Sequence, residues 1–149
     1  MKLKNYNTKA TVFFAMLPKD WQKAIVPYWE RIKTTTQLYV LVEKGEVIAG
    51  GLVFHQCPPD MVFYKEKANY WFDKGYLYLG FIFVDPSRRQ QNLGSKWIDM
   101  IKLLYPKQGF WLSVEDKKLD KFYVKNNFEK LETVINASNE KEIIYVYKP

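Results

Sequence analysis

Two runs of apolar residues in the first half of the chain are separated by one polar break. Residues 38–42 and 47–54 are rich in aliphatic and β-branched side chains, which is typical of β-strands. The break contains Lys44-Gly45, and the glycine accepts the positive φ that a tight turn requires. The pattern therefore predicts an antiparallel hairpin.

A longer apolar run begins at residue 76. Residues 76–84 are almost all aromatic, aliphatic or β-branched, which predicts a buried strand. Apolar residues then recur at helical spacing at Leu93, Trp97, Ile98, Ile101 and Leu104. The sequence thus predicts a buried strand, a short turn and an amphipathic helix in succession.

Shorter patterns complete the expected secondary structure. Residues 110–114, 131–135 and 143–147 are expected to be strands, and residues 119–128 a short helix and its exit. Near the start of the chain, a helix opening at Pro18 is expected to be kinked or divided at Pro27. Its apolar face carries Trp21, Ile25, Trp29 and Ile32.

A helix is also expected between residues 56 and 75. It would start at Pro58-Pro59-Asp60 and end at Gly75. One face would carry Met61, Tyr64, Ala68 and Trp71. An apolar stripe at this spacing normally packs in a core, so we favour packing over a role in shaping a binding pocket.

The order of these elements predicts an α/β fold with a mixed sheet. A chain of 149 residues with 48% hydrophobic residues has the size of one domain, here residues 1–149. No run of eighteen apolar residues and no secretory leader is present, so a cytoplasmic protein without a membrane partner is expected. The only cysteine, Cys57, and the only histidine, His55, make a metal site improbable.

The turn after the long strand has the features of an anion-binding loop. A strand-to-helix turn points unpaired N–H groups and the positive end of the helix dipole at one spot. Arg88 and Arg89, two of only three arginines in the chain, lie in this turn. Because a guanidinium group matches phosphate oxygens, the turn is expected to bind phosphate.

This turn resembles the acyl-CoA loop of the GNAT superfamily of N-acetyltransferases, in which a strand is followed by VxP, (R/Q)xxGxG(A/S) and a helix. Arg89, Gly94 and Ser95 match, while Asn92 replaces the first glycine. Asparagine is the non-glycine residue that best tolerates positive φ, so the replacement fits such a loop.

A second segment resembles the AxxLYEKLGF signature of the same family. Phe122-Tyr123 matches LY, Lys125 matches K, and Asn127-Phe128 matches GF. Asn127 again takes a glycine position, where a left-handed helix cap is expected. Asp116 falls where relatives often carry an asparagine that contacts the pantetheine arm. The two motifs have the family's order and spacing.

The resemblance implies the GNAT fold, with a mostly antiparallel sheet of about six to seven strands flanked by helices and splayed at the acyl-CoA site. The main chain of Ile82, Phe83 and Val84 would pair with pantetheine, and a backbone N–H of this strand would polarise the thioester carbonyl. The pyrophosphate would lie on Arg89, Gln90, Gln91, Asn92, Leu93, Gly94 and Ser95.

The resemblance also implies that Tyr123 is the general acid that protonates the departing thiolate. An ordinary phenol, with a pKa of about 10, stays protonated where a thiol of about 8.5 ionises. No base is assigned, because the strand offers no carboxylate. Asp85, Glu115 and His55 are the candidates, and an ordered water is the alternative.

We therefore expect transfer of acetyl from acetyl-CoA to a primary amine of unknown class, by direct attack in a ternary complex. A non-catalytic acyl-CoA sensor or regulatory module is the first alternative, and a homodimer is compatible with either. The net charge of +7 also allows nucleic-acid binding, but lysines mix with aromatic residues only between Tyr64 and Trp71. No nucleic-acid partner is expected.

Overall fold

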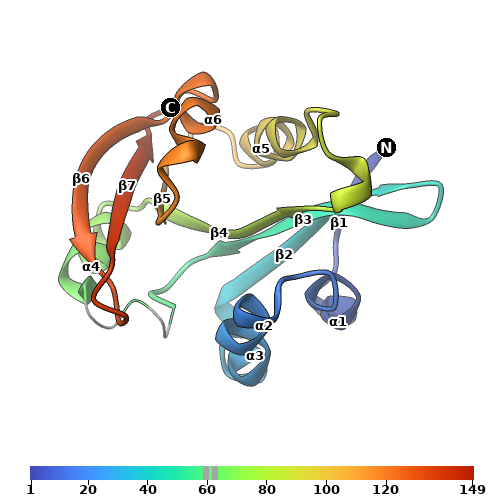
Figure 1. The fold of residues 1–149 in the computed structure, drawn as a ribbon, viewed down its shortest axis with the longest axis horizontal. Coiled ribbons are helices and arrows are strands. Elements are labelled where there is room, and N and C mark those ends of the chain that lie inside the picture. Colours follow the sequence, from blue (N-terminus) through green and yellow to red (C-terminus); the bar gives the residue numbers. More distant parts are fainter. Residues whose placement is uncertain (59–60, 62–63) are drawn as a thin grey trace.

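The structure, a computed structural model, describes residues 1–58, 61 and 64–149. Within them, seven strands form one sheet in the order β1-β2-β3-β4-β5-β7-β6, with helices on both faces (Figure 1). Neighbouring strands are antiparallel except β4 and β5, which run parallel. The predicted α/β class and mostly antiparallel sheet are confirmed.

The strands are β1 (Lys2–Asn5), β2 (Thr36–Glu43), β3 (Glu46–Phe54), β4 (Leu77–Val84), β5 (Phe110–Val114), β6 (Glu129–Ile135) and β7 (Lys141–Tyr147). The helices are α1 (Ala10–Phe14), α2 (Lys19–Ile25), α3 (Trp29–Ile32), α4 (Lys65–Asp73), α5 (Leu93–Leu104) and α6 (Asp120–Lys125). Helices α5 and α6 lie on one face of the sheet, and α1 to α3 lie on the other (Figure 1). None of the described helices is long and apolar enough to cross a membrane.

The expected hairpin and divided helix are both confirmed. Lys44 and Gly45 join β2 to β3 with φ values of 52° and 79°, the left-handed pair of a two-residue hairpin turn. Helix α2 ends at Ile25, and a 3₁₀ turn that contains Pro27 separates it from α3. Proline lacks the N–H that a continuous helix needs at this position.

The helix expected between residues 56 and 75 begins later than predicted. Helix α4 starts at Lys65, and the expected start at Pro59 and Asp60 lies outside the described residues. Gly75 follows the helix with φ +85°, as expected for its end. The predicted apolar stripe is buried at Met61, Tyr64, Ala68 and Trp71.

Strand β4 has its predicted position but not its predicted burial. Only Tyr78 and Leu79 are buried, and the rest of the strand is half-buried. The reason is that β4 and β5 pair only at Leu77↔Phe110 and Tyr78↔Trp111 before they separate. Burial of a strand requires a neighbour along both edges, which the pattern of one strand cannot reveal.

Strand β1 and helix α1 were not expected from the sequence. The strand is four residues of lysine-rich sequence at the edge of the sheet, a composition that weakens the strand pattern. The helix places Phe13 and Phe14 in the core, and Phe13 lies directly over Gly50 of β3.

Helix α5 is held against β3 by close packing of Trp97. A Cβ atom added to Gly51 would lie 2.7 Å from Cζ2 of Trp97, whose side chain is fully buried. The indole Nε1 of Trp97 donates a hydrogen bond of 3.0 Å to the carbonyl of Tyr39. This contact fixes where the helix begins, beside the end of β4.

We predict that Gly51→Ala destabilises the protein by about 1–3 kcal/mol, because the new methyl group overpacks a fixed indole. Urea unfolding would give the change in free energy. Gly45→Asn is the control, because nothing lies within 4 Å of a Cβ at Gly45 and asparagine tolerates its positive φ. Equal stabilities of the two variants would show that Trp97 is free to move.

Candidate functional site

The separation of β4 from β5 is accompanied by a bulge in β4. The register with β3 pairs Leu52 with Gly80 and Gly50 with Phe83, so β4 has one residue more than β3 in this interval. Phe81 in the bulge has a φ of 54°, which is uncommon for a side chain of its size. The backbone at Phe81 and Ile82 thus leaves the regular ladder where the neighbouring strand departs.

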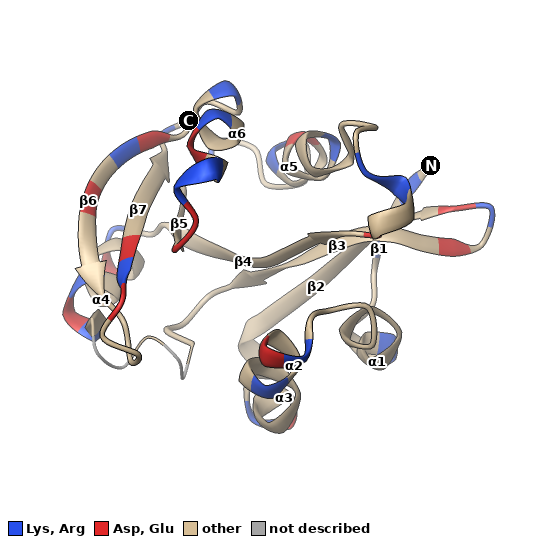
Figure 2. Cartoon of the chain, viewed as in Figure 1, with Lys and Arg blue, Asp and Glu red and all other residues tan. Residues whose placement is uncertain are grey.

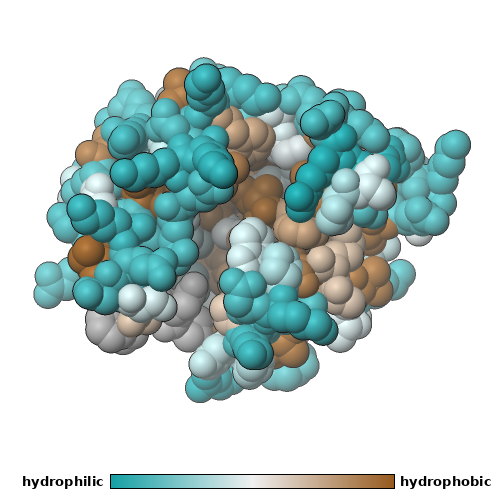
Figure 3. Space-filling view, viewed as in Figure 1, coloured by the Kyte–Doolittle hydropathy of each residue, from teal (hydrophilic) through white to brown (hydrophobic). Residues whose placement is uncertain are grey.

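A groove with a volume of ≈ 550 Å³ occupies this opening. Its walls are Tyr78 to Ile82 of β4 and Leu112 to Val114 of β5, and it extends to helices α2 and α6. The space-filling view shows the molecule hollowed here, with apolar atoms inside and hydrophilic residues around the rim (Figure 3). The groove is large enough for a narrow, extended ligand and its reaction partner.

Acidic side chains line part of the groove although the whole chain is basic. Asp20 of α2, Glu115 after β5 and Glu142 of β7 all line it. The charge distribution places acidic segments of these three elements around the opening (Figure 2). This part of the groove therefore favours a cationic ligand.

The surroundings of Glu115 disfavour the ionised form of its carboxyl. Partial burial raises the pKa of its carboxyl above the ordinary value of 4.5, and the negative charges of Glu142 and Glu140 raise it further. A hydrogen bond of 2.7 Å from Nδ2 of Asn136 opposes this shift without cancelling it. Of the three base candidates from the sequence, Glu115 is the one that lines the groove.

The other two candidates lie outside the groove. The Oδ1 atom of Asp85 accepts hydrogen bonds of 2.9 Å from the backbone N–H and the hydroxyl of Ser87. These bonds lower the pKa of the exposed Asp85 carboxyl. His55 follows β3 and is exposed. Asp85 therefore serves as a cap of the turn rather than as a base.

Tyr123 of helix α6 also lines the groove. Its side chain is only 6% exposed and packs against the rings of Phe122, Phe128 and Tyr145. Burial raises the pKa of its phenol well above the ordinary value of 10.0, so the hydroxyl keeps its proton. Among the described residues, no hydrogen-bond partner reaches this hydroxyl, which leaves it available to a ligand.

The loop between β4 and α5 has the backbone expected of an anion-binding turn. Gln90 has a φ of 65°, and Asn92, which precedes α5, has a φ of 61°. The predicted left-handed conformation of Asn92 is confirmed. Its Oδ1 atom accepts a hydrogen bond of 3.3 Å from Nζ of Lys125, which brings a further cation to the loop. The sequence motifs alone did not indicate this contact.

The two arginines of the loop have different environments. Nη2 of Arg88 lies 2.8 Å from Oε1 of Glu43 in the β2–β3 hairpin. Nε of Arg88 donates a hydrogen bond to Oε1 of Gln91. Cζ of Arg89 lies 5.3 Å from the ring centroid of Phe83, and the described residues offer it no carboxylate partner. Among the described residues Arg89 thus has no ion-pair partner, and its Nη2 lies 3.5 Å from the carbonyl of Val84, while Arg88 fastens the loop to the hairpin.

Gly94 and Ser95 join α5 to α6. A Cβ added to Gly94 would lie 3.0 Å from Cζ of Phe122. The Oγ atom of the buried Ser95 accepts a hydrogen bond of 3.1 Å from Nδ2 of Asn126. Leu93 is buried beneath the same turn. Part of the loop motif therefore has a packing role that is independent of any ligand.

The end of α6 is the cap that the sequence indicated. Asn127 has a φ of 68°. Its N–H donates a hydrogen bond to the carbonyl of Val124, and the N–H of Phe128 donates one to the carbonyl of Tyr123. This pair of bonds is the Schellman arrangement. It fixes the last turn of the helix that carries Tyr123.

Of the predicted site residues, Ile82, Asp116 and Tyr123 line the groove, whereas Phe83, Val84 and residues 89–95 do not. Ile82 lines the groove, and Phe83 and Val84 continue the open half of β4 toward the loop. Asp116 lines the groove too, although its Oδ1 accepts a hydrogen bond of 2.9 Å from the N–H of Lys118. Sequence reasoning missed Asp20, Ser113 and Glu142, because each lies on a different element and belongs to no local motif.

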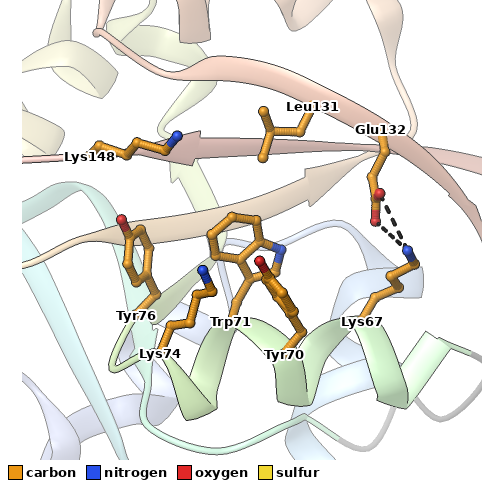
Figure 4. Close-up of a pocket in the computed structure, with 8 residues that line it drawn as sticks. All are labelled: Lys67, Tyr70, Trp71, Lys74, Tyr76, Leu131, Glu132 and Lys148. Carbon is orange, nitrogen blue, oxygen red and sulfur yellow. Dashed lines mark hydrogen bonds and ion pairs between the residues drawn. The ribbon is translucent and has the colours of Figure 1, made fainter.

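A second cavity of ≈ 760 Å³ lies between α4 and the β6–β7 pair (Figure 4). Trp71 points into it, and the ion pair of Lys67 with Glu132 lies at one end. No residue of the loop and no part of β4 lines this cavity. Tyr64 and Trp71 are buried, so much of the aromatic content between them belongs to the core.

Among the described residues, no group of three His, Cys, Asp or Glu side chains is placed to hold a metal ion.

A model of the acetyltransferase (GNAT) family matches residues 6–128. No curated protein sequence matches the chain. Among solved structures, an aminoglycoside 6'-N-acetyltransferase complexed with coenzyme A has a TM-score of 0.71 at 12% identity, with 99% of this chain and 97% of that chain covered.

Two further structures extend the similarity. The aminoglycoside 6'-N-acetyltransferase from Enterococcus faecium has a TM-score of 0.68 at 12% identity, covering 99% of this chain and 97% of that chain. FeeM, an N-acyl amino acid synthase from uncultured soil microbes, has a TM-score of 0.73 at 11% identity, covering 99% and 95%. The whole chain thus adopts a fold shared by these proteins.

We predict that Glu115→Gln raises the melting temperature at pH 7. The folded state raises the pKa of Glu115, so ionisation of this carboxyl costs stability as pH rises above the ordinary value of 4.5. The gain from the substitution should shrink as pH falls toward that value, because the carboxyl is then protonated in both states.

Thermal denaturation of both proteins between pH 4 and 8 would measure this difference. Glu129→Gln removes the same charge from the exposed end of β6 and serves as the control. A gain for Glu115→Gln that is independent of pH would contradict the electrostatic explanation.

Proposed function

Because the chain belongs to the acetyltransferase (GNAT) family, we propose that it transfers an acetyl group from acetyl-CoA to a primary amine. The observation that carries this proposal is the opening between β4 and β5. A bulged strand and a phenol hydroxyl line this opening, and the strand leads into a cationic loop. On this proposal the amine attacks the thioester directly in a ternary complex.

The residues around the opening fit acyl-CoA. The open half of β4 at Ile82, Phe83 and Val84 would receive the pantetheine arm, as an added strand, and the loop from Arg89 to Ser95 would receive the pyrophosphate. Support comes from the left-handed Asn92, from the unneutralised Arg89 and from the first turn of the twelve-residue helix α5. Lys125 would add charge beside the phosphates.

Tyr123 is the group that we propose as the general acid. It lines the groove, and burial keeps its phenol protonated at physiological pH. As the thioester breaks, the sulfur becomes a thiolate that can take this proton. Cys57 does not line the groove, so a covalent acyl-enzyme is not part of the proposal.

The acceptor is expected to be a cation with more than one amino group. Asp20, Glu115 and Glu142 line the same groove, and a protonated amine beside the two glutamates would relieve the repulsion between them. Diamines, polyamines and aminoglycosides share this chemistry. A non-catalytic acyl-CoA sensor would need the loop but not the acidic part of the groove.

We predict that Arg89→Glu weakens acetyl-CoA binding by at least about tenfold, because charge-assisted contacts to phosphate contribute roughly 1.5–3 kcal/mol each. Calorimetric titration of the folded variant would measure it. Arg31→Glu, which changes the net charge equally on α3, is the control. No binding of acetyl-CoA or CoA to the wild-type protein at millimolar ligand would overturn the cofactor assignment.

We predict that Tyr123→Phe lowers kcat by about 10²- to 10⁴-fold, the range of general acid catalysis, without changing acetyl-CoA affinity. The ring packing is retained, so binding and chemistry are separated. CoA release with diamines, polyamines and aminoglycosides as acceptors is the assay.

Tyr145→Phe is the matched control for this experiment. Its ring lies 5.3 Å from that of Tyr123, but its hydroxyl donates to Asp120. Equal kcat values for wild type and Tyr123→Phe would make Tyr123 a packing residue. No turnover of any amine by a protein that binds acetyl-CoA would favour the sensor.

A further inference from the structure

Three hydroxyl groups and a carboxylate form a continuous hydrogen-bonded chain beside the groove. The Tyr78 Oη atom of β4 lies 3.1 Å from Oγ of Ser113 in β5, and Oγ of Ser113 lies 3.0 Å from Oη of Tyr64. Tyr64 then donates a hydrogen bond of 3.3 Å to Oε1 of Glu142 in β7. The chain connects residues that are far apart in sequence.

The carboxylate gives this chain a direction. Tyr64 donates its single hydroxyl hydrogen to Oε1 of Glu142. Ser113 is then left to donate to Tyr64, and Tyr78 is left to donate to Ser113. Every hydrogen points from the β4 end toward Glu142, which is the arrangement that a proton relay requires.

The two ends of the chain lie where a relay would be useful. Tyr78, Ser113 and Glu142 line the groove, and the side chains of Tyr64 and Tyr78 are each 7% exposed. The two tyrosines are therefore largely shielded from bulk water, while Ser113 is half-buried on the groove wall. Tyr78 also stands three residues before Phe81 of the bulge, on the same wall of the groove.

The other charged side chains that line the groove with Glu142 are acidic. Glu115 is close enough for its pKa to respond to Glu142, and Asp20 of α2 lines the same groove. A proton that arrives at Glu142 removes one of these negative charges. The local field therefore favours the movement of a proton toward this end of the chain.

We propose that this chain removes the proton of the acceptor ammonium group and delivers it to Glu142. The inference rests on the proposed acetyl transfer. The ammonium gives its proton to Oη of Tyr78, whose own hydrogen passes to Oγ of Ser113. The Ser113 hydrogen passes to Oη of Tyr64, and the Tyr64 hydrogen passes to Oε1 of Glu142.

The proton count closes over the reaction. Each hydroxyl loses one hydrogen and gains one, so the net change is a neutral Glu142 carboxyl and a neutral amine. The amine attacks the thioester, the leaving sulfur gains a proton from Tyr123, and the second proton lost by the nitrogen replaces it on the Tyr123 oxygen. Glu142 is half-buried and returns its proton to solvent.

The relay answers a need that the rest of the groove leaves open. A primary amine has a pKa of about 10, so it is mostly protonated and not nucleophilic at neutral pH. Strand β4 itself carries no carboxylate. Tyr78 touches the acceptor in this mechanism, while Ser113, Tyr64 and Glu142 act through it and are positioning and proton-accepting groups.

Ser113→Ala interrupts the chain, and Ser113→Thr retains its hydroxyl. We expect the alanine variant, and likewise Glu142→Gln, to lower kcat by about 10²-fold, while the threonine variant restores most of the activity. The double variant Ser113→Ala/Glu142→Gln should be no slower than either single variant, because both break one unit. Acetyl-CoA affinity should be unchanged in all four.

A proton inventory gives a readout that packing does not affect. In mixtures of H₂O and D₂O, a relay of several hydrogens gives a bowed dependence of kcat on deuterium content, and Ser113→Ala should make it linear. Tyr39→Phe is the control, because it removes a hydroxyl from the separate 2.9 Å pair with Tyr105.

The outcomes separate the relay from the proposed function. If the wild-type protein acetylates an amine and Ser113→Ala retains its kcat and a bowed inventory, the relay is wrong and acetyl transfer stands. The same holds if the effects of Ser113→Ala and Glu142→Gln are additive. If the wild-type protein binds acetyl-CoA but acetylates no amine in the screen, the proposed function fails first.

Discussion

The rest of the structure depends on how short the parallel pairing between β4 and β5 is. Two residue pairs hold the strands together, and beyond them each strand follows a different neighbour, β3 on one side and β7 on the other. Unpaired backbone is costly inside a protein unless something replaces the lost partner. The open edge of β4 therefore offers backbone hydrogen-bonding groups to water or to a ligand that lies along it.

The loop above this edge is prepared before any ligand arrives. Two non-glycine residues, Gln90 and Asn92, already have left-handed backbones, and Asp85 and Arg88 fasten the start of the turn. The ion pair of Arg88 with Glu43 is partly exposed, so it contributes little to stability. Its value lies in holding the loop in place, because a preordered loop loses less entropy on binding.

Much of the fold could be predicted because its signals are local. The spacing of apolar residues predicted the β2–β3 hairpin, β4 and α5. Asn92 and Asn127, which stand where the family motifs have glycine, predicted the two left-handed turns. Strand β1 was not predicted, because its four residues at the edge of the sheet are rich in lysine and have no apolar pattern. The predicted burial of β4 was wrong because it depends on β5, which separates from β4 after two residue pairs.

The polar part of the groove had no local signal of any kind. Tyr64, Tyr78, Ser113 and Glu142 belong to four separate elements, and only the sheet order brings them together. Glu115 was among the candidates, but the pKa of its carboxyl is raised by partial burial and by Glu142 across the β5–β7 pair. A loop motif can be recognised in the sequence, whereas a hydrogen-bond network between strands can be recognised only once the order of the strands in the sheet is known.

The contact between Gly94 and Phe122 has an evolutionary consequence. A methyl group at residue 94 would press on a ring of α6, so selection for a stable fold acts on this glycine even where no ligand is bound. A descendant that had lost all cofactor affinity would still be under pressure to keep it. Arg89, which has no carboxylate partner among the described residues, is under no such pressure and would be among the first residues to drift.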